Sequence, residues 1–187
     1  KKGNWWVQDF SSFFPLSEVH KQKNYEKFID LCAAPGGKSF QILSHNKNII
    51  LNDINKTRIE VLKENLKRLN FKTKIINFDT LKIDEKNKFD FIILDAPCSA
   101  VGTIRKNPEI FFHKKGPNIE KIKNLQEKML DKATSLLSQD GVILYMVCSF
   151  LKQETLDQID LFLNKHKNYF IDNFKIDGDN IYFNNLV

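Results

Sequence analysis

The stretch Asp30-Leu-Cys-Ala-Ala-Pro-Gly-Gly-Lys-Ser39 decides the fold of this chain. It continues the short apolar run at residues 27–31, and its adjacent glycines, Gly36 and Gly37, are expected to begin a helix. Glycine lets the backbone turn tightly and approach a ligand, and the helix that follows offers free N–H groups to that ligand. The sequence therefore predicts a ligand-binding loop between a first strand and a first helix.

Strand-like and helix-like segments alternate along the rest of the chain, without an internal repeat. Short apolar runs predict strands, and apolar residues at helical spacing predict the helices between them. The later predicted strands are residues 48–52, 74–78, 89–94 and 142–147, with weaker runs at 169–176 and 181–183; helices are predicted around 59–69, 119–136 and 156–163. Residues 100–117 are expected to form a long functional loop, and an Asp140-Gly141 turn introduces the strand at 142–147. The alternation predicts a doubly wound, mostly parallel α/β sheet with helices on both faces.

Chemically useful side chains follow the ends of the predicted strands. Ligands of open α/β sheets bind beyond the carboxyl ends of the strands, so residues at those ends share one edge of the sheet. The residues at or near such ends are Asp30, Asp53, Asp79, Asp95 and Cys148. The sequence therefore predicts one site, built from residues that are far apart along the chain.

The glycine loop lacks the glycine patterns of two common nucleotide-binding loops, and this narrows the choice of its ligand. A Walker phosphate loop needs a glycine at the position of Cys32, and a nicotinamide fingerprint needs three spaced glycines rather than one adjacent pair. S-adenosylmethionine fits better, because it is an adenosine ligand without phosphates. Asp53 is expected to accept hydrogen bonds from its ribose hydroxyls, and Asp79 to face its adenine. A plain strand-to-helix turn without a ligand remains the alternative.

Two cysteines are predicted to lie on neighbouring strand ends. Cys98 follows the strand at 89–94 in Asp95-Ala-Pro-Cys, and Cys148 ends the strand at 142–147. A single cysteine after an apolar run is ordinarily a small core residue, but two that face one cofactor cleft indicate chemistry. A Cys98–Cys148 disulfide is the competing interpretation. Three cysteines suit a reducing compartment, so we expect free thiols and a cytoplasmic location.

The pair of cysteines suits methyl transfer to carbon 5 of a cytosine. A thiolate that adds to C6 makes C5 a carbon nucleophile, which takes a methyl group before the H5 proton leaves and the thiol is eliminated. The thiolate needs nearby positive charge or dipoles, for which Lys38 and Arg105 are candidates. Asp95 is expected to hydrogen-bond the base at N3 or N4 as charge builds in its ring.

The same motifs resemble those of the NOL/NOP/Sun family of RNA (cytosine-5) methyltransferases. The likeness runs from residue 3 to about Glu154. The chain departs from the family at Met146-Val147, where the family usually has Ser-Thr. The motifs that carry the likeness are Gly3-Asn-Trp-Trp-Val-Gln-Asp-Phe-Ser-Ser12, Cys32-Ala-Ala-Pro-Gly-Gly-Lys38, Asp95-Ala-Pro-Cys-Ser-Ala-Val-Gly-Thr-Ile-Arg105, Asn107-Pro-Glu109 and Tyr145-Met-Val-Cys-Ser149.

The resemblance implies a Rossmann-like class I methyltransferase fold with a seven-stranded sheet. It implies that Cys148 attacks C6 and that Cys98 assists proton removal or product release. Chemistry alone does not separate these roles, since DNA cytosine methyltransferases use their Pro-Cys cysteine as the nucleophile. The implied S-adenosylmethionine site comprises Cys32, Ala33, Ala34, Pro35, Gly36, Gly37, Lys38, Asp53, Asp79 and Asp95.

The implied substrate is RNA, with 16S rRNA as the first expectation and tRNA as the alternative. The target base would have to leave its stack to reach the cleft. The net charge of +6 fits an anionic partner, although a solvated lysine-rich surface explains it equally well. The loop residues that would contact RNA, or merely anchor the loop, are Arg105, Lys106, Phe111, Phe112, Lys114 and Lys115.

The length of 187 residues predicts one catalytic domain, residues 1–187. The chain begins at Lys1 and is expected to be part of a longer protein, without the N-terminal RNA-binding region of the family. We expect a monomer that uses no metal. We also expect no membrane partner, because no apolar run approaches the length of about 20 residues that a membrane-spanning helix needs. Two other functions stay open: a non-catalytic RNA-binding or ribosome-assembly protein with a degenerate methyltransferase fold, and an amino-group methyltransferase, which would leave both thiols unexplained.

Overall fold

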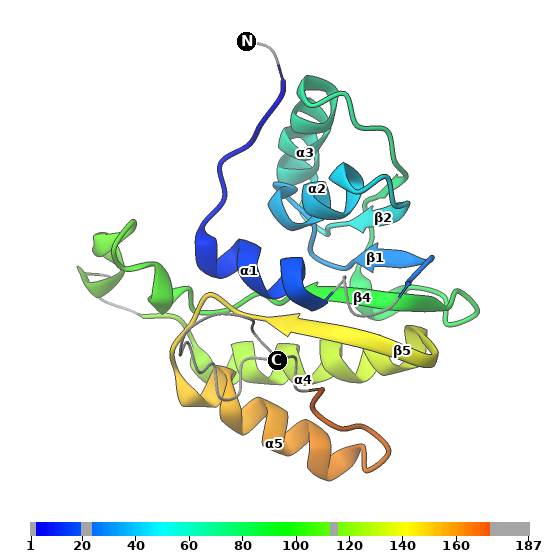
Figure 1. The fold of residues 1–187 in the computed structure, drawn as a ribbon. Helices are drawn as coiled ribbons and strands as arrows, with labels where there is room; N and C mark the ends of the chain where they lie inside the picture. The colour runs from blue at the N-terminus through cyan, green and yellow to red at the C-terminus, as the bar shows by residue number, and fades with distance from the viewer. Residues whose placement is uncertain (1–2, 20–23, 113–115, 173–187) are drawn as a thin grey trace, which may run out of the picture.

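A five-stranded parallel sheet forms the centre of the molecule (Figure 1). The computed structural model describes residues 3–19, 24–112 and 116–172, and every structural statement below concerns these residues. The strands are β1 (Phe28–Asp30), β2 (Ile49–Asn52), β3 (Ile75–Ile76), β4 (Phe89–Asp95) and β5 (Leu137–Met146). Their order in the sheet is β3-β2-β1-β4-β5. The order reverses between β1 and β4, which is where open α/β sheets bind their ligands.

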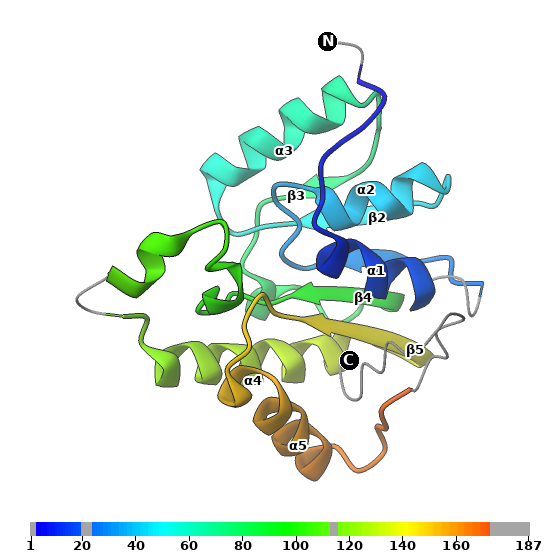
Figure 2. The same cartoon turned by 60° about the vertical axis from the view of Figure 1, so that its left-hand side comes forward.

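Helices cover both faces of the sheet (Figures 1 and 2). One face carries α1 (Phe10–Val19), α2 (Gly37–Ser44) and α3 (Lys56–Arg68), and the other carries α4 (Ile119–Leu136) and α5 (Leu156–Lys165). Four short 3-10 turns complete the described elements: η1 (Thr80–Lys82), η2 (Val101–Thr103), η3 (Pro108–Phe112) and η4 (Lys152–Glu154). The doubly wound α/β fold predicted from the sequence is thereby confirmed.

The alternation of side chains along β4 explains why both faces need a cover. Phe91 and Ile93 pack against α1–α3, whereas Ile92 and Leu94 pack against α4. All four are fully buried, which is why this strand is a continuous apolar run rather than an alternating one. Burial of each such side chain stabilises the fold by about 1.5–3 kcal/mol, so β4 fixes the position of the residues that follow it.

The structure differs from the sequence prediction at the end of the sheet. Five strands are described where seven were expected, and the residues from 169 to 172 form no strand. The remainder of the predicted run at 169–176, and the run at 181–183, lie outside the described residues. Strand β5 begins at Leu137 rather than Val142, because Asp140 adopts a positive φ of 59° and the register with β4 shifts instead of the strand ending.

The first helix, α1, was not predicted as a helix. Pro15 lies inside it, and two of its large apolar side chains, Phe10 and Phe13, face solvent, so the segment lacks a clear apolar stripe. The predicted long loop at 100–117 contains two helical turns, η2 and η3. None of the described helices combines the length and the apolar character that a bilayer crossing needs.

Candidate active site

The glycine loop joins β1 to α2 through a backbone that only glycine fits. Gly36 has a φ of 117°, and a Cβ there would lie 2.1 Å from the ring of Phe40 and 2.8 Å from Leu62. The Ala34–Pro35 peptide bond before it is cis. The backbone of the loop at Gly36 is therefore set by close packing against α2 and α3, whereas the sequence-based prediction attributes the glycines to the approach of a ligand.

A buried carboxyl braces this loop from behind. The side chain of Asp30, at the end of β1, accepts hydrogen bonds from Ser39 Oγ at 2.7 Å and from the backbone N–H of Cys32 at 3.2 Å. Burial raises its pKa from the ordinary 3.8 to about 7, since these hydrogen bonds and Lys38 offset the loss of solvent only in part. Asp30 thus ties the start of the loop to the helix that follows it.

Asp53 lies beside the glycine loop, as predicted, but its oxygens already have partners. It accepts hydrogen bonds from the backbone N–H groups of Ala34 at 3.2 Å and Asn55 at 2.8 Å, and Arg58 lies 3.5 Å away. Only 3% of its side chain is exposed. In this arrangement Asp53 links the glycine loop to the end of β2.

The two remaining acids are more open. Asp79 follows β3 and caps η1 by accepting from the backbone N–H of Leu81 at 3.1 Å. Asp95 ends β4 and binds the Nζ of Lys38 at 2.6 Å, with about a third of its side chain exposed. The Lys38–Asp95 pair joins the glycine loop to the strand that leads to Cys98, so the two predicted halves of the site meet here.

The two cysteines lie in contact. Cys98 Sγ and Cys148 Sγ are 3.2 Å apart, which is far longer than the roughly 2.05 Å of a disulfide bond, and both thiols are free. They meet because Asp95 on β4 pairs with Met146 on β5, and because the backbone N–H of Gly102 binds the carbonyl of Cys148 at 3.0 Å. The sequence prediction of neighbouring free thiols is confirmed.

The two thiols differ in acidity. The hydrogen bond from Cys98 lowers the pKa of Cys148 to about 7, against the opposing effects of burial and of Asp95, and Lys38 lowers it further. The same hydrogen bond, with burial, raises the pKa of Cys98. Of the two thiols, Cys148 is therefore the one that ionises more readily. Burial and nearby acids instead raise the pKa of Cys32, whose thiol stays protonated.

Sequence reasoning gave no role to Glu154. This residue ends η4, is fully buried, and accepts hydrogen bonds from Ser99 and Ser149, the residues that follow the two cysteines. Burial alone would raise its pKa, but hydrogen bonds from Ser149, Ser99 and Gln126 hold that pKa below its usual range. A single glutamate forms no periodic pattern, so the family likeness, which ends at about this residue, was its only signal in the sequence.

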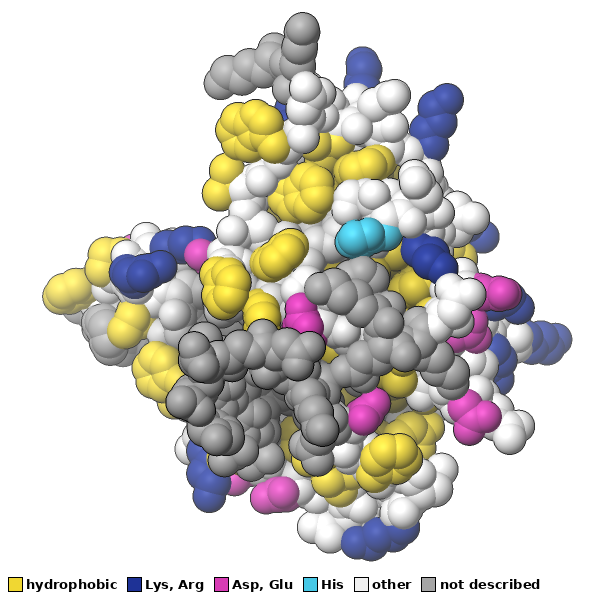
Figure 3. All heavy atoms as spheres, in the orientation of Figure 1, with side chains coloured by type: hydrophobic (Ala, Val, Ile, Leu, Met, Phe, Trp, Pro, Cys, Tyr) yellow, Lys and Arg dark blue, Asp and Glu magenta, His cyan; other side chains and the backbone are white. Residues whose placement is uncertain are grey.

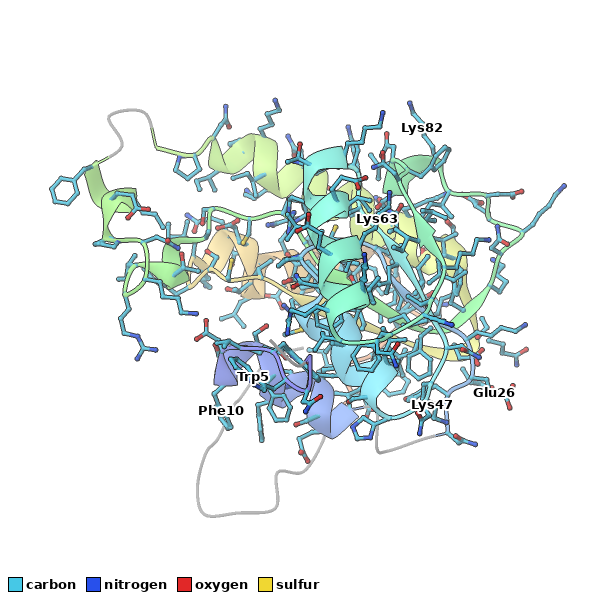
Figure 4. All side chains as sticks on the ribbon, turned by 90° about the horizontal axis from the view of Figure 1, so that it is seen from above. Trp5, Phe10, Glu26, Lys47, Lys63 and Lys82 are labelled. Carbon is cyan, nitrogen blue, oxygen red and sulfur yellow. The ribbon has the colours of Figure 1, made fainter. Side chains whose placement is uncertain are left out.

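An apolar patch borders the site on the N-terminal segment. Figure 3 shows apolar side chains gathered over this segment and α1, and Figure 4 shows Trp5 and Phe10 on its outer side. Trp6 turns inward and packs on Phe40, with ring centroids 5.8 Å apart. An ion pair between Asp9 and Lys106 joins the segment to the loop after Cys98.

The predicted RNA-contacting residues are only partly described. Arg105 and Lys106 are exposed, and 82% of Phe112 is open to solvent. The side chain of Phe111, and all of Lys114 and Lys115, lie outside the described residues. The exposed members lie on the loop that follows Cys98, at the same edge of the sheet as the thiols.

The methyltransferase likeness extends to whole sequences and folds. The family profile described as 16S rRNA methyltransferase RsmB/F matches residues 18–184. A ribosomal RNA small subunit methyltransferase B from Shewanella oneidensis is 41% identical over 162 residues, which are 84% of this chain and 38% of the relative.

Two solved structures share the fold. The crystal structure of PH0851 matches with a TM-score of 0.81 and 37% identity, over 88% of this chain and 39% of that protein. NSun6 from Pyrococcus horikoshii, solved with SFG, matches with a TM-score of 0.77 and 30% identity, over 88% and 43%. The chain thus spans about two fifths of the length of these relatives. By profile, sequence and fold, this chain belongs to the RsmB/F family of 16S rRNA methyltransferases.

Proposed function

We propose that this chain is the catalytic domain of an S-adenosylmethionine-dependent methyltransferase that makes 5-methylcytosine in RNA, with 16S rRNA as the substrate. The observation that carries the proposal is the pair of free thiols, 3.2 Å apart, at the ends of β4 and β5. Methyl transfer to nitrogen or oxygen has no use for two such thiols. Methyl transfer to C5 of cytosine uses one to activate the ring and one to complete the reaction.

The cofactor would bind across the carboxyl ends of β1, β2, β3 and β4. When bound, S-adenosylmethionine supplies an electrophilic methyl group on a positively charged sulfur. The donor set of the site fits such a ligand: carboxylates suit hydroxyl and amino groups and a cation, and the loop offers backbone N–H groups without a phosphate cradle. The residues assigned to it are 32–38, Asp53, Asp79 and Asp95. Asp53 would reach the ribose only by exchanging one of its present backbone partners.

Cys148 would begin the reaction. Its thiolate sulfur would form a bond to C6 of the cytosine, and the electron pair of the C5=C6 bond would shift toward C5. C5 would then bond to the methyl carbon as the bond from that carbon to the cofactor sulfur breaks, with its electron pair left on the sulfur. Asp95 ends the neighbouring strand β4, at the same edge of the sheet as Cys148, and from there it would hold the base at N3 or N4. The hydrogen bond from Cys98 lowers the pKa of Cys148, which favours the thiolate that this step needs.

Cys98 would complete the reaction. The H5 proton leaves, its C–H electron pair re-forms the C5=C6 bond, and the C6–S electron pair returns to Cys148. Cys98 lies in contact with the departing sulfur, where its thiolate form would accept the proton, or its thiol would donate a hydrogen bond to the returning Cys148 thiolate. In both cases elimination requires Cys98, whereas the first bond uses Cys98 only through the hydrogen bond that lowers the pKa of Cys148, so loss of Cys98 should slow that bond without preventing it.

The departure from the family pattern before Cys148 fits this function. Val147 packs against the apolar core that α4 and β5 share, so its side chain is used for packing rather than left beside the thiolate. Retention of two contacting thiols also gives no support to a non-catalytic assembly protein. We further propose that the enzyme acts as a monomer in the cytoplasm, and that RNA binding uses the exposed loop residues Arg105, Lys106 and Phe112.

The product of the reaction tests this function. The chain is incubated with methyl-labelled S-adenosylmethionine and either 16S rRNA or tRNA, and the RNA is digested to nucleosides for mass spectrometry. We expect label in 5-methylcytidine from rRNA with the unaltered chain and none with Cys148→Ala. Label in an N-methylated nucleoside, or equal labelling with Cys148→Ala, would contradict the proposal. Label in tRNA alone would reassign the substrate.

A further inference from the structure

The carboxylate of Glu154 connects the two turns that carry the cysteines. Its Oε1 accepts from the backbone N–H of Ser99 at 2.8 Å, and its Oε2 accepts from Ser149 Oγ at 2.6 Å and from Ser99 Oγ. Ser99 directly follows Cys98, and Ser149 directly follows Cys148. One side chain therefore holds the residue after each sulfur-bearing residue.

Further hydrogen bonds fix this carboxylate. Gln126 Nε2, from α4, donates to Glu154 Oε1 at 3.1 Å and to the carbonyl of Pro97 at 3.0 Å, one residue before Cys98. Tyr145 Oη donates to the backbone carbonyl of Glu154 at 3.0 Å. Glu154 is thus held by α4 and β5 while it holds both turns, and its charge is buried with a full set of donors.

A purely structural role for Glu154 would explain why its carboxylate is buried, but not why its partners are the residues that follow the two cysteines. The two turns lie beyond the ends of β4 and β5, where the backbone hydrogen bond from Gly102 to Cys148 and the contact between the Ser99 and Ser149 hydroxyls join them beside the carboxylate. The hydrogen bond between the two sulfurs, at 3.2 Å, weakens when their separation changes by a few tenths of an ångström, so a rigid group that holds both turns preserves it. A carboxylate suits this task, because its two oxygens accept from several donors at once.

We infer that Glu154 is a positioning residue that sets the separation of the Cys98 and Cys148 sulfurs by holding the turns that carry them. The catalytic purpose of this positioning rests on the proposed function, whereas the hydrogen bonds that hold the two turns do not depend on it. Glu154 has no contact with either sulfur and acts through Ser99 and Ser149. Its loss should therefore change the reactivity of Cys148 and not merely the stability of the fold.

The test is the pH dependence of thiol alkylation in the reduced chain. Iodoacetamide is added at a series of pH values, and mass spectrometry of the digested chain follows Cys32, Cys98 and Cys148 separately. Cys148 of the unaltered chain should titrate with a midpoint near pH 7. In Glu154→Ala we expect this midpoint to rise toward the ordinary thiol value of about 8.5, which lowers alkylation at pH 7 roughly tenfold.

Matched variants separate positioning from folding. Leu136→Ala removes a fully buried side chain at the end of α4 remote from the thiols, so it should lower the melting temperature without moving the midpoint. Glu154→Gln keeps the size and one acceptor oxygen, and should shift the midpoint less than Glu154→Ala. If Glu154→Ala does not fold, Ser149→Ala supplies the same test, because it removes one link and leaves the carboxylate.

The outcome decides between the two interpretations. A raised Cys148 midpoint in Glu154→Ala or Ser149→Ala, with none in Leu136→Ala, supports the positioning role. An unchanged midpoint in a folded Glu154→Ala or, if that variant is unfolded, in Ser149→Ala would overturn it. The measurement needs neither RNA nor cofactor. If the Cys148 midpoint rises in Glu154→Ala as expected, but the unaltered chain methylates no cytosine, only the proposed function is contradicted.

Discussion

The glycine loop after β1 and the cysteine turns after β4 and β5 are each held by a buried carboxyl group, but the pKa of that group is raised in one and lowered in the other. Each is braced from behind by a buried carboxyl group, Asp30 in the first and Glu154 in the second. Asp30 accepts hydrogen bonds from Ser39 and Cys32, and burial raises its pKa to about 7. Glu154 accepts from Ser99, Ser149 and Gln126, and its pKa is lowered despite burial. The number of donors decides whether a buried carboxyl group carries charge.

The thiols of the two regions differ in the same way. Burial, Asp30 and other acids raise the pKa of Cys32 in the glycine loop, whereas the Cys98 hydrogen bond lowers that of Cys148. One residue type is therefore inert in one region and reactive in the other. The comparison indicates that the glycine loop is built for binding and the cysteine turns for reaction.

The largest effect that would test this comparison comes from replacing the cysteine of each region by alanine. Cys148→Ala should lower single-turnover methyl transfer roughly a thousandfold or more, because no other group is placed to add to C6. Cys32→Ala should retain activity within about tenfold, since its thiol is protonated and packed in the loop. Comparable losses in the two variants would end the distinction between a binding and a reacting region.

The two buried carboxyl groups should give opposite pH dependences of stability. The folded-state pKa of Asp30 is raised, so the free energy of unfolding should fall as pH rises from about 4 to about 7, by about 4 kcal/mol. The folded-state pKa of Glu154 is lowered from its ordinary 4.5, so its contribution is present above that pH and lost as pH falls through the folded-state value.

Denaturant unfolding as a function of pH checks these signs. Asp30→Asn should flatten the decline between pH 4 and 7, and Glu154→Gln should flatten the acid limb only. If Asp30→Asn left the decline in the free energy of unfolding between pH 4 and 7 unchanged, the proposed difference between the two buried carboxyl groups would be contradicted.

The next effect concerns the backbone of the glycine loop. Gly36→Ala should destabilise the fold by about 2–3 kcal/mol, because the added Cβ meets Phe40 and Leu62 at a φ that L-residues rarely adopt. Gly37→Ala is the matched control, since its Cβ would lie 3.7 Å from Gln8, an ordinary contact. Thermal unfolding of both variants gives the comparison, and equal losses would contradict the close packing at Gly36.

The smallest effect concerns the link between the two regions. Lys38→Met removes the positive charge that pairs with Asp95 and lowers the pKa of Cys148. We expect the alkylation midpoint of Cys148 to rise by less than one pH unit. Lys106→Met, which breaks the pair with Asp9, should leave it in place. A lowered midpoint in Lys38→Met would reverse the assigned sign of its charge effect.

The parts that the sequence predicted well are those set by local patterns. The glycine pair marked the loop after β1, and apolar runs that end in Asp95 and Cys148 placed the thiols on neighbouring strands. What was missed depends on distant partners. The donors to Glu154 come from three other segments, and Asp53 is occupied by backbone groups that only folding brings near. The helix α1 was missed because Pro15 and exposed phenylalanines hide its pattern.

The most direct test of the division of labour between the thiols is covalent trapping on a denaturing gel. The unaltered chain, Cys98→Ala and Cys148→Ala are each incubated with S-adenosylmethionine and cytosine-containing 16S rRNA. We predict that Cys98→Ala accumulates a shifted protein–RNA band, because its adduct forms but is not eliminated, and that Cys148→Ala forms none. A band that persists in Cys148→Ala and disappears in Cys98→Ala would contradict the account, because it would make Cys98 the nucleophile.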